Sequence, residues 1–225
     1  MKRFSSTIKE RLTGRHRYSC IFSGKIKGLK ILDIGCSYGW FEKFAVTNKC
    51  KEIIGIEPEI NSFYKAPQEV PSAKFKIGSA LKVNEKNNKF DMVVMFDVIE
   101  HIPKNTEFKA LKEISRVLKK NGVLVLSTDF DWWLAKILDP AWYFGHRHNS
   151  EERLKKMLSK TGFKIEQVDI KGRYFEVFGT ILLYIFKWIF RREIPFKKYF
   201  DKKKDEEFLG TKSGFVTIFI KAKKL

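Results

Sequence analysis

Short apolar runs alternate with stretches of helical periodicity along most of the chain. Five runs have the length and residue types of β-strands, and they occupy residues 30–35, 52–57, 73–78, 90–96 and 122–128. All but the third are apolar on both faces, which is typical of strands buried inside a parallel sheet. Strands that alternate with helices predict an α/β fold: a doubly wound, mostly parallel sheet with helices on both faces.

Three stretches have apolar residues at helical spacing, at residues 40–48, 105–122 and 149–163. In the second, one stripe collects the apolar residues Phe108, Leu111, Ile114, Val117 and Leu118. This pattern predicts a helix through Lys120 that ends in a cap at Asn121 and Gly122. The third stretch has Ser150 as its expected N-cap and should stop at Gly162. Two further strand patterns follow, at residues 163–170 and 215–222.

The chain has 225 residues, which suits one domain with a full core or one domain with a sizeable insertion. The aromatic share is high at 15%, so much of the chain must be buried in a core or against another surface. The three cysteines lack CxxC spacing, and residues 1–20 lack the apolar core of a secretory signal. We therefore expect a reduced, cytoplasmic protein.

The formal net charge is +19, from 45 basic and 26 acidic side chains. A charge of this sign predicts attraction to polyanions such as nucleic acid, an anionic membrane face or a phosphorylated substrate. A lysine-rich solvated surface is the alternative explanation, and the charge alone does not separate the two.

The sequence ILDIGCSYGW, residues 31–40, places a glycine-bracketed turn between a buried strand and a helix. Such a turn presents backbone N–H groups and lets a ligand lie against bare backbone. A nicotinamide-dinucleotide site requires the spacing G-x-G-x-x-G, which Gly35 and Gly39 do not have. The stretch does resemble motif I, (D/E)-x-G-x-G-x-G, of the class I S-adenosylmethionine-dependent methyltransferases. Asp33, Gly35, Ser37 and Gly39 stand at its defined positions, with serine in place of the middle glycine.

Further parts of the resemblance follow in the family's order. Glu57 ends the second strand, where the family keeps an acidic residue for the ribose hydroxyls; an acidic residue that merely ends a strand is the alternative. FDMVVMFDVIEHIP, residues 90–103, matches the fourth-strand motif, and VLKKNGVLVLST matches the helix and strand that come next. The resemblance covers roughly residues 28–170. It implies a Rossmann-like, seven-stranded sheet with an antiparallel last strand, S-adenosylmethionine as cofactor and S-adenosylhomocysteine as product.

The resemblance also implies which residues bind this cofactor. Asp33 is expected near its charged amino-acid end, and Ser79 and Ala80 near the adenine, where the family often has an acidic residue. The full expected set is Asp33, Gly35, Cys36, Ser37, Gly39, Glu57, Pro58, Ser79, Ala80, Phe96 and Asp97.

Methyl transfer from a sulfonium is an in-line displacement, and the protein's main contribution is to hold acceptor and methyl group in line. A base is needed only when the acceptor is protonated at neutral pH. His101, after the fourth strand, is a candidate catalytic base; a histidine that only shapes the loop is the alternative. The ubiquinone-pathway O-methyltransferases carry a similar E-x-x-E-H and use it with a metal. Asp97, Glu100 and His101 are therefore an alternative metal site, although we expect no metal.

Residues 130–149 follow the fifth strand, where this fold gathers its acceptor-binding parts. Their aromatic side chains would wall an apolar acceptor pocket, with His146 and His148 as polar groups inside it, and His148 is the second catalytic candidate. A hydrophobic flap packed on the core is the alternative. Residues 1–27 are expected to form a basic helix or cap over the cleft, or else a disordered arm.

Residues 172–213 separate the last two strands, which form a close pair in the family. Only ten uncharged residues lie between Glu176 and Lys187, whereas a membrane-spanning helix needs about 20. Aromatic and aliphatic residues followed by clustered Arg and Lys are typical of an interfacial anchor, so residues 175–204 are predicted to bind the anionic inner face of the membrane. A helix packed across the sheet edge and a homodimer interface are the alternatives.

The sequence therefore predicts a methyltransferase domain at residues 28–225 that acts on a small-molecule, lipid or lipid-linked glycan acceptor, with oxygen favoured as the acceptor atom. An RNA methyltransferase would suit the charge, but FDVIEH stands where methyltransferases of exocyclic base nitrogens have (N/D)-P-P-(Y/F). A binding module that keeps the fold without catalysis is a third interpretation. We expect a cytoplasmic enzyme that associates peripherally with the membrane.

Overall fold

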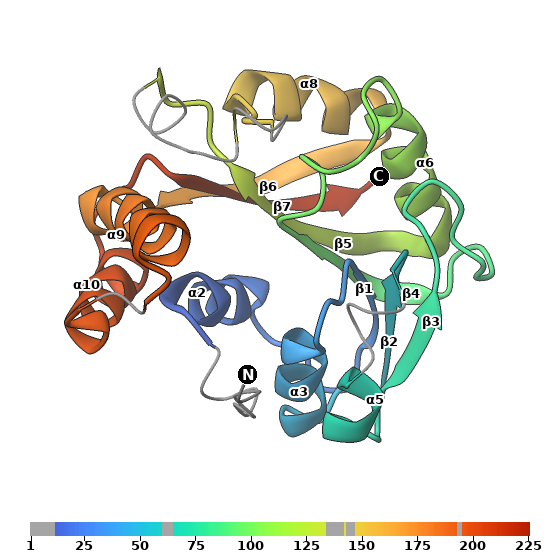
Figure 1. The fold of residues 1–225 in the computed structure, drawn as a ribbon. Helices are drawn as coiled ribbons and strands as arrows, with labels where there is room; N and C mark the ends of the chain where they lie inside the picture. The colour runs from blue at the N-terminus through green and yellow to red at the C-terminus, as the bar shows by residue number, and fades with distance from the viewer. Residues whose placement is uncertain (1–11, 60–64, 134–141, 143–146, 193–194) are drawn as a thin grey trace.

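The computed structural model describes residues 12–59, 65–133, 142, 147–192 and 195–225. Within these residues, seven strands form one sheet in the order β3-β2-β1-β4-β5-β7-β6 (Figure 1). Strand β7 runs antiparallel to both of its neighbours, and the pairs from β3 to β5 are all parallel. The predicted Rossmann-like sheet with an antiparallel last strand is confirmed.

The strands are β1 (Lys30–Ile34), β2 (Glu52–Glu57), β3 (Lys74–Ile77), β4 (Phe90–Phe96), β5 (Leu118–Asp129), β6 (Phe163–Lys171) and β7 (Thr217–Lys224). The helices in the described residues are α2 (Gly14–Ser23), α3 (Trp40–Thr47), α5 (Ala66–Glu69), α6 (Glu107–Val117), α8 (Glu151–Lys160), α9 (Tyr174–Ile185) and α10 (Lys197–Leu209), with a π-helical turn η2 (Phe186–Phe190). Strands β1, β2 and β4 are buried and the edge strand β3 is largely exposed, as the sequence pattern predicted.

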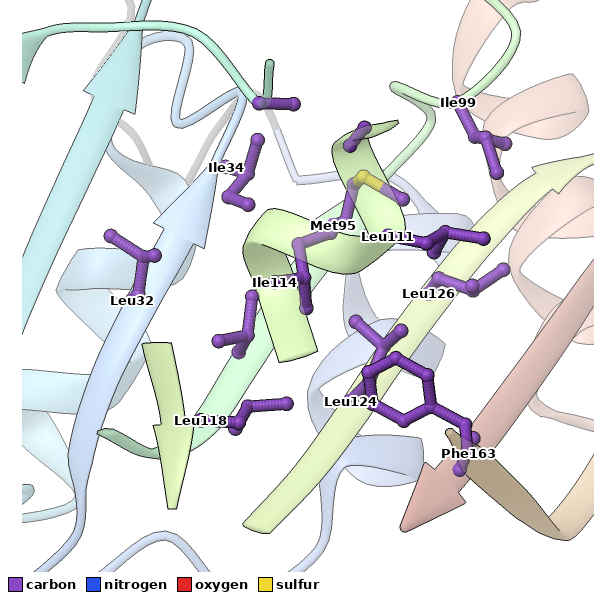
Figure 2. Packing of buried hydrophobic residues seen from close by; sticks show 14 of the residues in the cluster. Leu32, Ile34, Met95, Ile99, Leu111, Ile114, Leu118, Leu124, Leu126 and Phe163 are labelled. Atoms are coloured by element: carbon purple, nitrogen blue, oxygen red, sulfur yellow. The ribbon is translucent and has the colours of Figure 1, made fainter. Parts of the chain in front are cut away.

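Two layers of apolar side chains join the helices to the two faces of the sheet. On one face, Leu111 and Ile114 of α6 pack with Met95 of the sheet, and all three are fully buried (Figure 2). On the other face, Phe22 of α2 and Phe41 of α3 belong to a second buried cluster. Full burial of a side chain of this size contributes about 1.5–3 kcal/mol, so each helix is held mainly by its apolar stripe.

The end of α6 differs from the prediction. The helix stops at Val117, and Leu118 already pairs with Phe90 in the sheet. Pairing resumes between Met92 and Val123, so residues 119–122 form a bulge opposite a single residue of β4. The predicted helix through Lys120 was therefore wrong. Helical periodicity alone would extend the helix, but from Leu118 the backbone pairs with β4 instead.

Other details of the predicted helices can be compared in the same way. The sequence pattern places Phe108 on the apolar stripe of α6, and Phe108 is 39% exposed, so the stripe is not buried at this position. The start of α8 is confirmed, since the Ser150 side chain accepts a hydrogen bond of 3.2 Å from the Arg153 N–H. Gly162 follows the end of α8 with a left-handed φ of +85°, as expected for a helix stop.

The residues between β6 and β7 form α9, η2 and α10, and α10 packs against both α9 and α2. In Figure 1 this pair of helices lies beside α2, away from α6 and α8. The Glu207 carboxylate of α10 accepts hydrogen bonds of 2.8–2.9 Å from the N–H groups of Arg173, Phe175 and Glu176. One carboxylate thus caps the N-terminus of α9, where free N–H groups favour negative charge. None of the helices that the structure describes combines the length and apolar character needed to cross a bilayer.

Candidate active site

A cavity of about 810 Å³ opens at the carboxyl ends of β1, β2 and β4, with α2 forming part of its wall. Its size is typical of small-molecule sites. The predicted site residues that line it are Gly35, Ser37, Glu57, Pro58, Ser79, Ala80, Phe96, Asp97 and His101. Asp33, Cys36, Gly39 and His148 do not line this cavity.

The turn after β1 forms one wall through its backbone. Gly35 has a φ of +81°, and a Cβ there would come within 2.3 Å of the Val98 side chain, so only glycine fits. Ser37 also has a left-handed φ, of 45°, and its N–H donates a 3.1 Å hydrogen bond to Oε2 of Glu57. Serine therefore keeps the backbone shape for which the family motif has glycine, and the carboxylate at the end of β2 helps to hold it.

Glu57 is half-buried at the end of β2 and faces the cavity. Its Oε2 accepts from Ser37, while its Oε1 has no partner among the residues that the structure describes. A carboxylate with one free oxygen beside a bare backbone turn is suited to accept hydrogen bonds from ligand hydroxyls.

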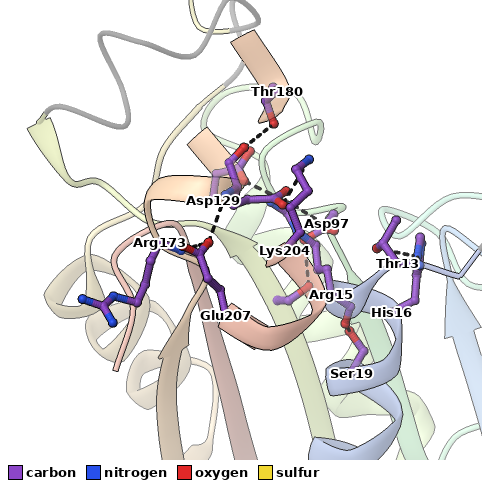
Figure 3. A network of polar contacts seen from close by, with 12 residues as sticks. Thr13, Arg15, His16, Ser19, Asp97, Asp129, Arg173, Thr180, Lys204 and Glu207 are labelled. Carbon is purple, nitrogen blue, oxygen red and sulfur yellow. Dashed lines mark hydrogen bonds and ion pairs between the residues drawn. The ribbon is translucent and has the colours of Figure 1, made fainter. Parts of the chain in front are cut away.

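Arg15 of α2 organises the acidic side of the cavity (Figure 3). Its Nη1 lies 3.3 Å from Oδ2 of Asp97 and 3.3 Å from Oδ1 of Asp129, and its Nη2 lies 3.6 Å from Glu176. Burial alone would lower the pKa of Arg15, but these carboxylates raise it above its ordinary value. Asp97 has a left-handed φ of 53° and accepts a 2.8 Å hydrogen bond from the Ser127 hydroxyl. The ends of β4 and β5 are thus tied to α2 and to α9.

His16 of α2 lines the cavity next to Trp40, with ring centroids 4.5 Å apart in an edge arrangement. Its Nδ1 lies 3.1 Å from the backbone nitrogen of Thr13, which can only donate. Nδ1 must therefore be the acceptor, and the ring proton is on Nε2. Burial lowers the pKa of His16 to about 4, so the ring is neutral at pH 7.

Asp33 and Glu42 lie behind the turn after β1. Asp33 is 2% exposed and Glu42 is fully buried, and a Cβ on Gly55 would come within 2.3 Å of Oε1 of Glu42 and 2.7 Å of Cβ of Cys36. Burial raises the pKa of Asp33 to about 8, and burial and the neighbouring Asp33 charge raise the pKa of Glu42 well above its ordinary range. The two carboxyl groups therefore retain a proton at neutral pH, and Asp33 supports the turn from behind.

His101 is exposed at the wall of the cavity. Its backbone N–H donates a 2.9 Å hydrogen bond to the Val98 carbonyl oxygen. Glu100, next to it, is 3% exposed and accepts a 2.9 Å hydrogen bond from the Thr128 hydroxyl. Burial and the charges of Asp97 and Asp129 raise the pKa of Glu100. No group of three or more His, Cys, Asp and Glu side chains in the described ranges is arranged to hold a metal ion, and the structure gives the alternative metal site no support.

The predicted acceptor flap lies only partly within the described residues. Nδ1 of His148 lies 3.1 Å from the Phe130 carbonyl oxygen. Arg147 donates to the carbonyl oxygens of Ile99 and Glu100, each at 3.0 Å, and so ties the end of the flap to the loop that carries His101. His146 and the aromatic pair at positions 143 and 144 lie outside the described residues.

The residues of α2 that line the cavity are Arg15, His16 and Ser19. The sequence predicts a basic helix, cap or arm at residues 1–27 but points to none of these three. No local motif marks them, because their place at the site depends on how α2 packs over the strand ends.

A model of the methyltransferase domain family matches residues 8–168, and the chain belongs to this family. It is a class I methyltransferase domain, whose cofactor is S-adenosylmethionine. The residues present suit this cofactor, because the turn has no side chain at Gly35 and Oε1 of Glu57 has no partner among the described residues.

Among the relatives of the chain, the ubiquinone biosynthesis O-methyltransferase of Azorhizobium caulinodans is 26% identical over 107 residues, which cover 46% of this chain and 41% of that protein. Sphingolipid C9-methyltransferase B of Emericella nidulans is 22% identical over 219 residues, covering 86% of this chain and 40% of that protein. The chain thus spans about two fifths of the length of these relatives.

Among solved structures, an S-adenosylmethionine-dependent methyltransferase of Mesorhizobium loti has a TM-score of 0.66 at 14% identity, over 94% of this chain and 98% of that one. At this identity the similarity establishes a shared fold.

Proposed function

We propose that the protein transfers the methyl group of S-adenosylmethionine to an oxygen of a small-molecule, lipid or lipid-linked acceptor. The observation that carries this proposal is the single cavity that joins the Gly35 turn, Glu57 and Asp97 at the ends of three adjacent strands, with His101 in the same wall. Parallel sheets of this kind bind ligands at the carboxyl ends of their strands.

The proposed cofactor-binding roles follow from position in the cavity. Glu57 accepts from the ribose hydroxyls through its free oxygen, and the backbone of Gly35 and Ser37 lies against the cofactor. Ser79 and Ala80 after β3 contact the adenine. Phe96 and Asp97 at the end of β4 take the amino-acid end. Pro58 completes the wall at the ribose side, while Asp33, Cys36 and Gly39 hold the turn in shape from behind.

When bound, the cofactor supplies the electrophilic methyl group. The contribution of the chain is then to position the acceptor and to accept its proton where it carries one. His101 is the proposed base, because it lies in the cavity wall next to the end of β4. His148 does not line the cavity, but Arg147 ties its segment to the His101 loop, and on this ground His148 is a second proposed acceptor contact.

A lipid acceptor is favoured by an exposed apolar surface on the insertion. The insertion surface, as we define it, consists of Tyr174, Phe178, Leu183, Ile185, Trp188, Ile189 and Phe190, each at least 36% exposed. Lys187, Arg191 and Arg192 lie within or directly after it, and Lys197 and Lys198 start α10. Apolar side chains flanked by cations suit the interface of an anionic leaflet. The names of the two relatives given above refer to ubiquinone and to a sphingolipid, both of which are lipids.

Calorimetric titration with S-adenosylhomocysteine tests the cofactor site. Wild-type protein should bind with micromolar affinity, and Glu57→Ala should bind at least about tenfold more weakly because a charge-assisted contact is lost. Glu52→Ala is the matched control, since Glu52 begins the strand that Glu57 ends and is paired with Lys74 instead. Absence of binding in the wild type, or equal losses in both variants, would contradict the proposal. Acceptors are then screened with a labelled methyl donor, with and without anionic vesicles.

A further inference from the structure

A second hollow, of about 390 Å³, lies at the amino ends of β4 and β5. Lys25, Lys119, Lys120 and Lys221 line it together with Asp91, and we call it the basic hollow. In a parallel sheet the amino ends share one edge, so this hollow lies at the opposite edge from the 810 Å³ cavity, with which it shares no lining residue.

The bulge in β5 builds one side of the basic hollow. Residues 119–122 lie opposite Asp91 alone, which pushes Lys119 and Lys120 out of the regular pairing. Asn121 turns the chain with a left-handed φ of 62°, and a Cβ on Gly122 would come within 2.9 Å of the Lys119 carbonyl oxygen. The bulge is therefore tightly packed, and it holds the two lysines at fixed places on the rim.

The positive charge of the basic hollow is not neutralised from within. Among the described residues, Asp91 is the only acidic one that lines it, and both of its oxygens accept hydrogen bonds. Oδ1 accepts from Nζ of Lys119 at 2.5 Å, and Oδ2 accepts from the Lys30 N–H at 2.8 Å. Lys25, Lys120 and Lys221 have no carboxylate within 4.0 Å in the part of the chain that the structure describes, which leaves three cations around one hollow.

Lys221 is the most constrained of these three. It extends from β7 so that its Nζ lies 5.2 Å from the centroid of the Phe22 ring and 3.6 Å from where a Cβ on Gly24 would be. Burial lowers the pKa of Lys221, and the charge of Glu166 opposes that shift only in part. A partly dehydrated ammonium group without an ion-pair partner gains from an anion that takes the place of the lost water.

We propose that the basic hollow binds the phosphate groups of a small diphosphate or triphosphate. One phosphate group carries about −1.5 to −2 charges at pH 7, so two linked groups match three unpaired lysines better than a single carboxylate does. A hollow of 390 Å³ is also within the size range of small-molecule sites. Phosphates presented by lipid headgroups share this chemistry, and the experiment separates that source from a free ligand.

The test is calorimetric titration with inorganic pyrophosphate at two salt concentrations. Two variants change the basic hollow: the double variant Lys25→Ala/Lys120→Ala, at exposed positions, and the near-isosteric Lys221→Met. Lys43→Ala/Lys112→Ala removes the same charge from exposed positions on α3 and α6 and is the matched control. The dissociation constant should rise about tenfold or more in both hollow variants and change less than about twofold in the control. Thermal unfolding confirms that each variant is folded.

Equal weakening in the control would show that only diffuse surface charge acts. No pyrophosphate binding by folded wild-type protein would show that the hollow is not a phosphate site. Either result would overturn the proposal. Flotation with phosphatidic acid vesicles is the second arm. Hollow-dependent flotation without pyrophosphate binding would assign the site to a membrane headgroup and overturn the small-ligand proposal. Affinity for S-adenosylhomocysteine should be unchanged in all variants, so this outcome is independent of the proposed methyl transfer.

Discussion

Arg15 of α2 and Glu176 of α9 form an ion pair of 3.6 Å across the boundary between the insertion and the cofactor cavity. The same guanidinium contacts Asp97 and Asp129 at the ends of β4 and β5. Lys204 of α10 also contacts Glu176, at 3.2 Å. The Arg15 side chain therefore connects the insertion to the wall where the amino-acid end of the cofactor is proposed to bind.

Loss of Arg15 should destabilise the fold. Arg15→Met would leave three carboxylates close together without their shared cation, and removing one partner of a buried ion pair costs up to about 3–5 kcal/mol. Urea denaturation measures the loss. Arg17→Met is the control, because Arg17 is 45% exposed on the same helix and its ion-pair partner among the described residues is Asp205; exposed pairs contribute about 0–1 kcal/mol. Equal losses in the two variants would mean that Arg15 does not organise this cluster.

The buried carboxyl pair should make stability fall as the pH rises. Folding raises the pKa of Asp33 from 3.8 to about 8, so the folded state holds a proton that the unfolded state releases. The stabilisation is present below about pH 4 and is lost as the pH rises towards 8, with a slope of up to about 1.4 kcal/mol per pH unit. Urea denaturation between pH 5 and pH 9 measures this loss, and its slope with pH should correspond to the release of about one proton on unfolding.

Glu42→Gln separates this effect from other titrations. A glutamine amide can donate to the Asp33 carboxylate without a titrating proton, so the variant should gain stability relative to wild type as the pH rises from 6 to 8. Glu152→Gln, at an exposed position on α8, should follow the wild-type curve. Parallel curves for wild type and Glu42→Gln would show that the pair does not retain a proton.

His16 should remain neutral with its proton on Nε2. Its folded pKa of about 4 lies below the ordinary 6.5, so the related stability is present above pH 6.5 and is lost as the pH falls towards 4. Two-dimensional NMR of ¹⁵N-labelled histidine reports the tautomer and the midpoint directly. A midpoint above pH 6, or a proton on Nδ1, would contradict the hydrogen bond from Thr13. His148 in the same spectra gives an internal comparison.

The local motifs could be predicted because their information is contiguous. The turn after β1 is recognisable from Gly35 and Gly39, and Glu57 is found by its place at the end of the next buried strand. Helix α6 was recognised from its periodicity, but its end was not. At Leu118 the apolar side chain suits a helix stripe and a buried strand equally well, and only the pairing with Phe90 decides between them.

The contribution of α2 could not be predicted for a different reason. Arg15 is adjacent in space to Asp97, Asp129 and Glu176, which lie far from it in sequence, so no spacing rule connects them. The buried position of Asp33 behind the turn was missed as well. Its motif identifies the residue type but not that Glu42, in the first turn of α3, lies beside it.

The insertion surface should carry membrane binding, and its two most exposed apolar residues test this best. Trp188 is 63% and Ile189 is 71% exposed, and full burial of such side chains is worth about 1.5–3 kcal/mol each. Trp188→Ser/Ile189→Ser should therefore reduce flotation with anionic vesicles by about tenfold or more. Ile77→Ser is the control, because Ile77 is 64% exposed on the edge strand β3, away from the insertion.

Lys197→Ala/Lys198→Ala should weaken binding mainly at low salt, since about 1 kcal/mol per cation is expected at an anionic surface and is screened as salt rises. If the control loses as much flotation as the insertion variant, or if neutral vesicles bind as well as anionic ones, the surface instead covers a protein partner, and size measurements of wild type against Trp188→Ser/Ile189→Ser would identify a second copy of the chain.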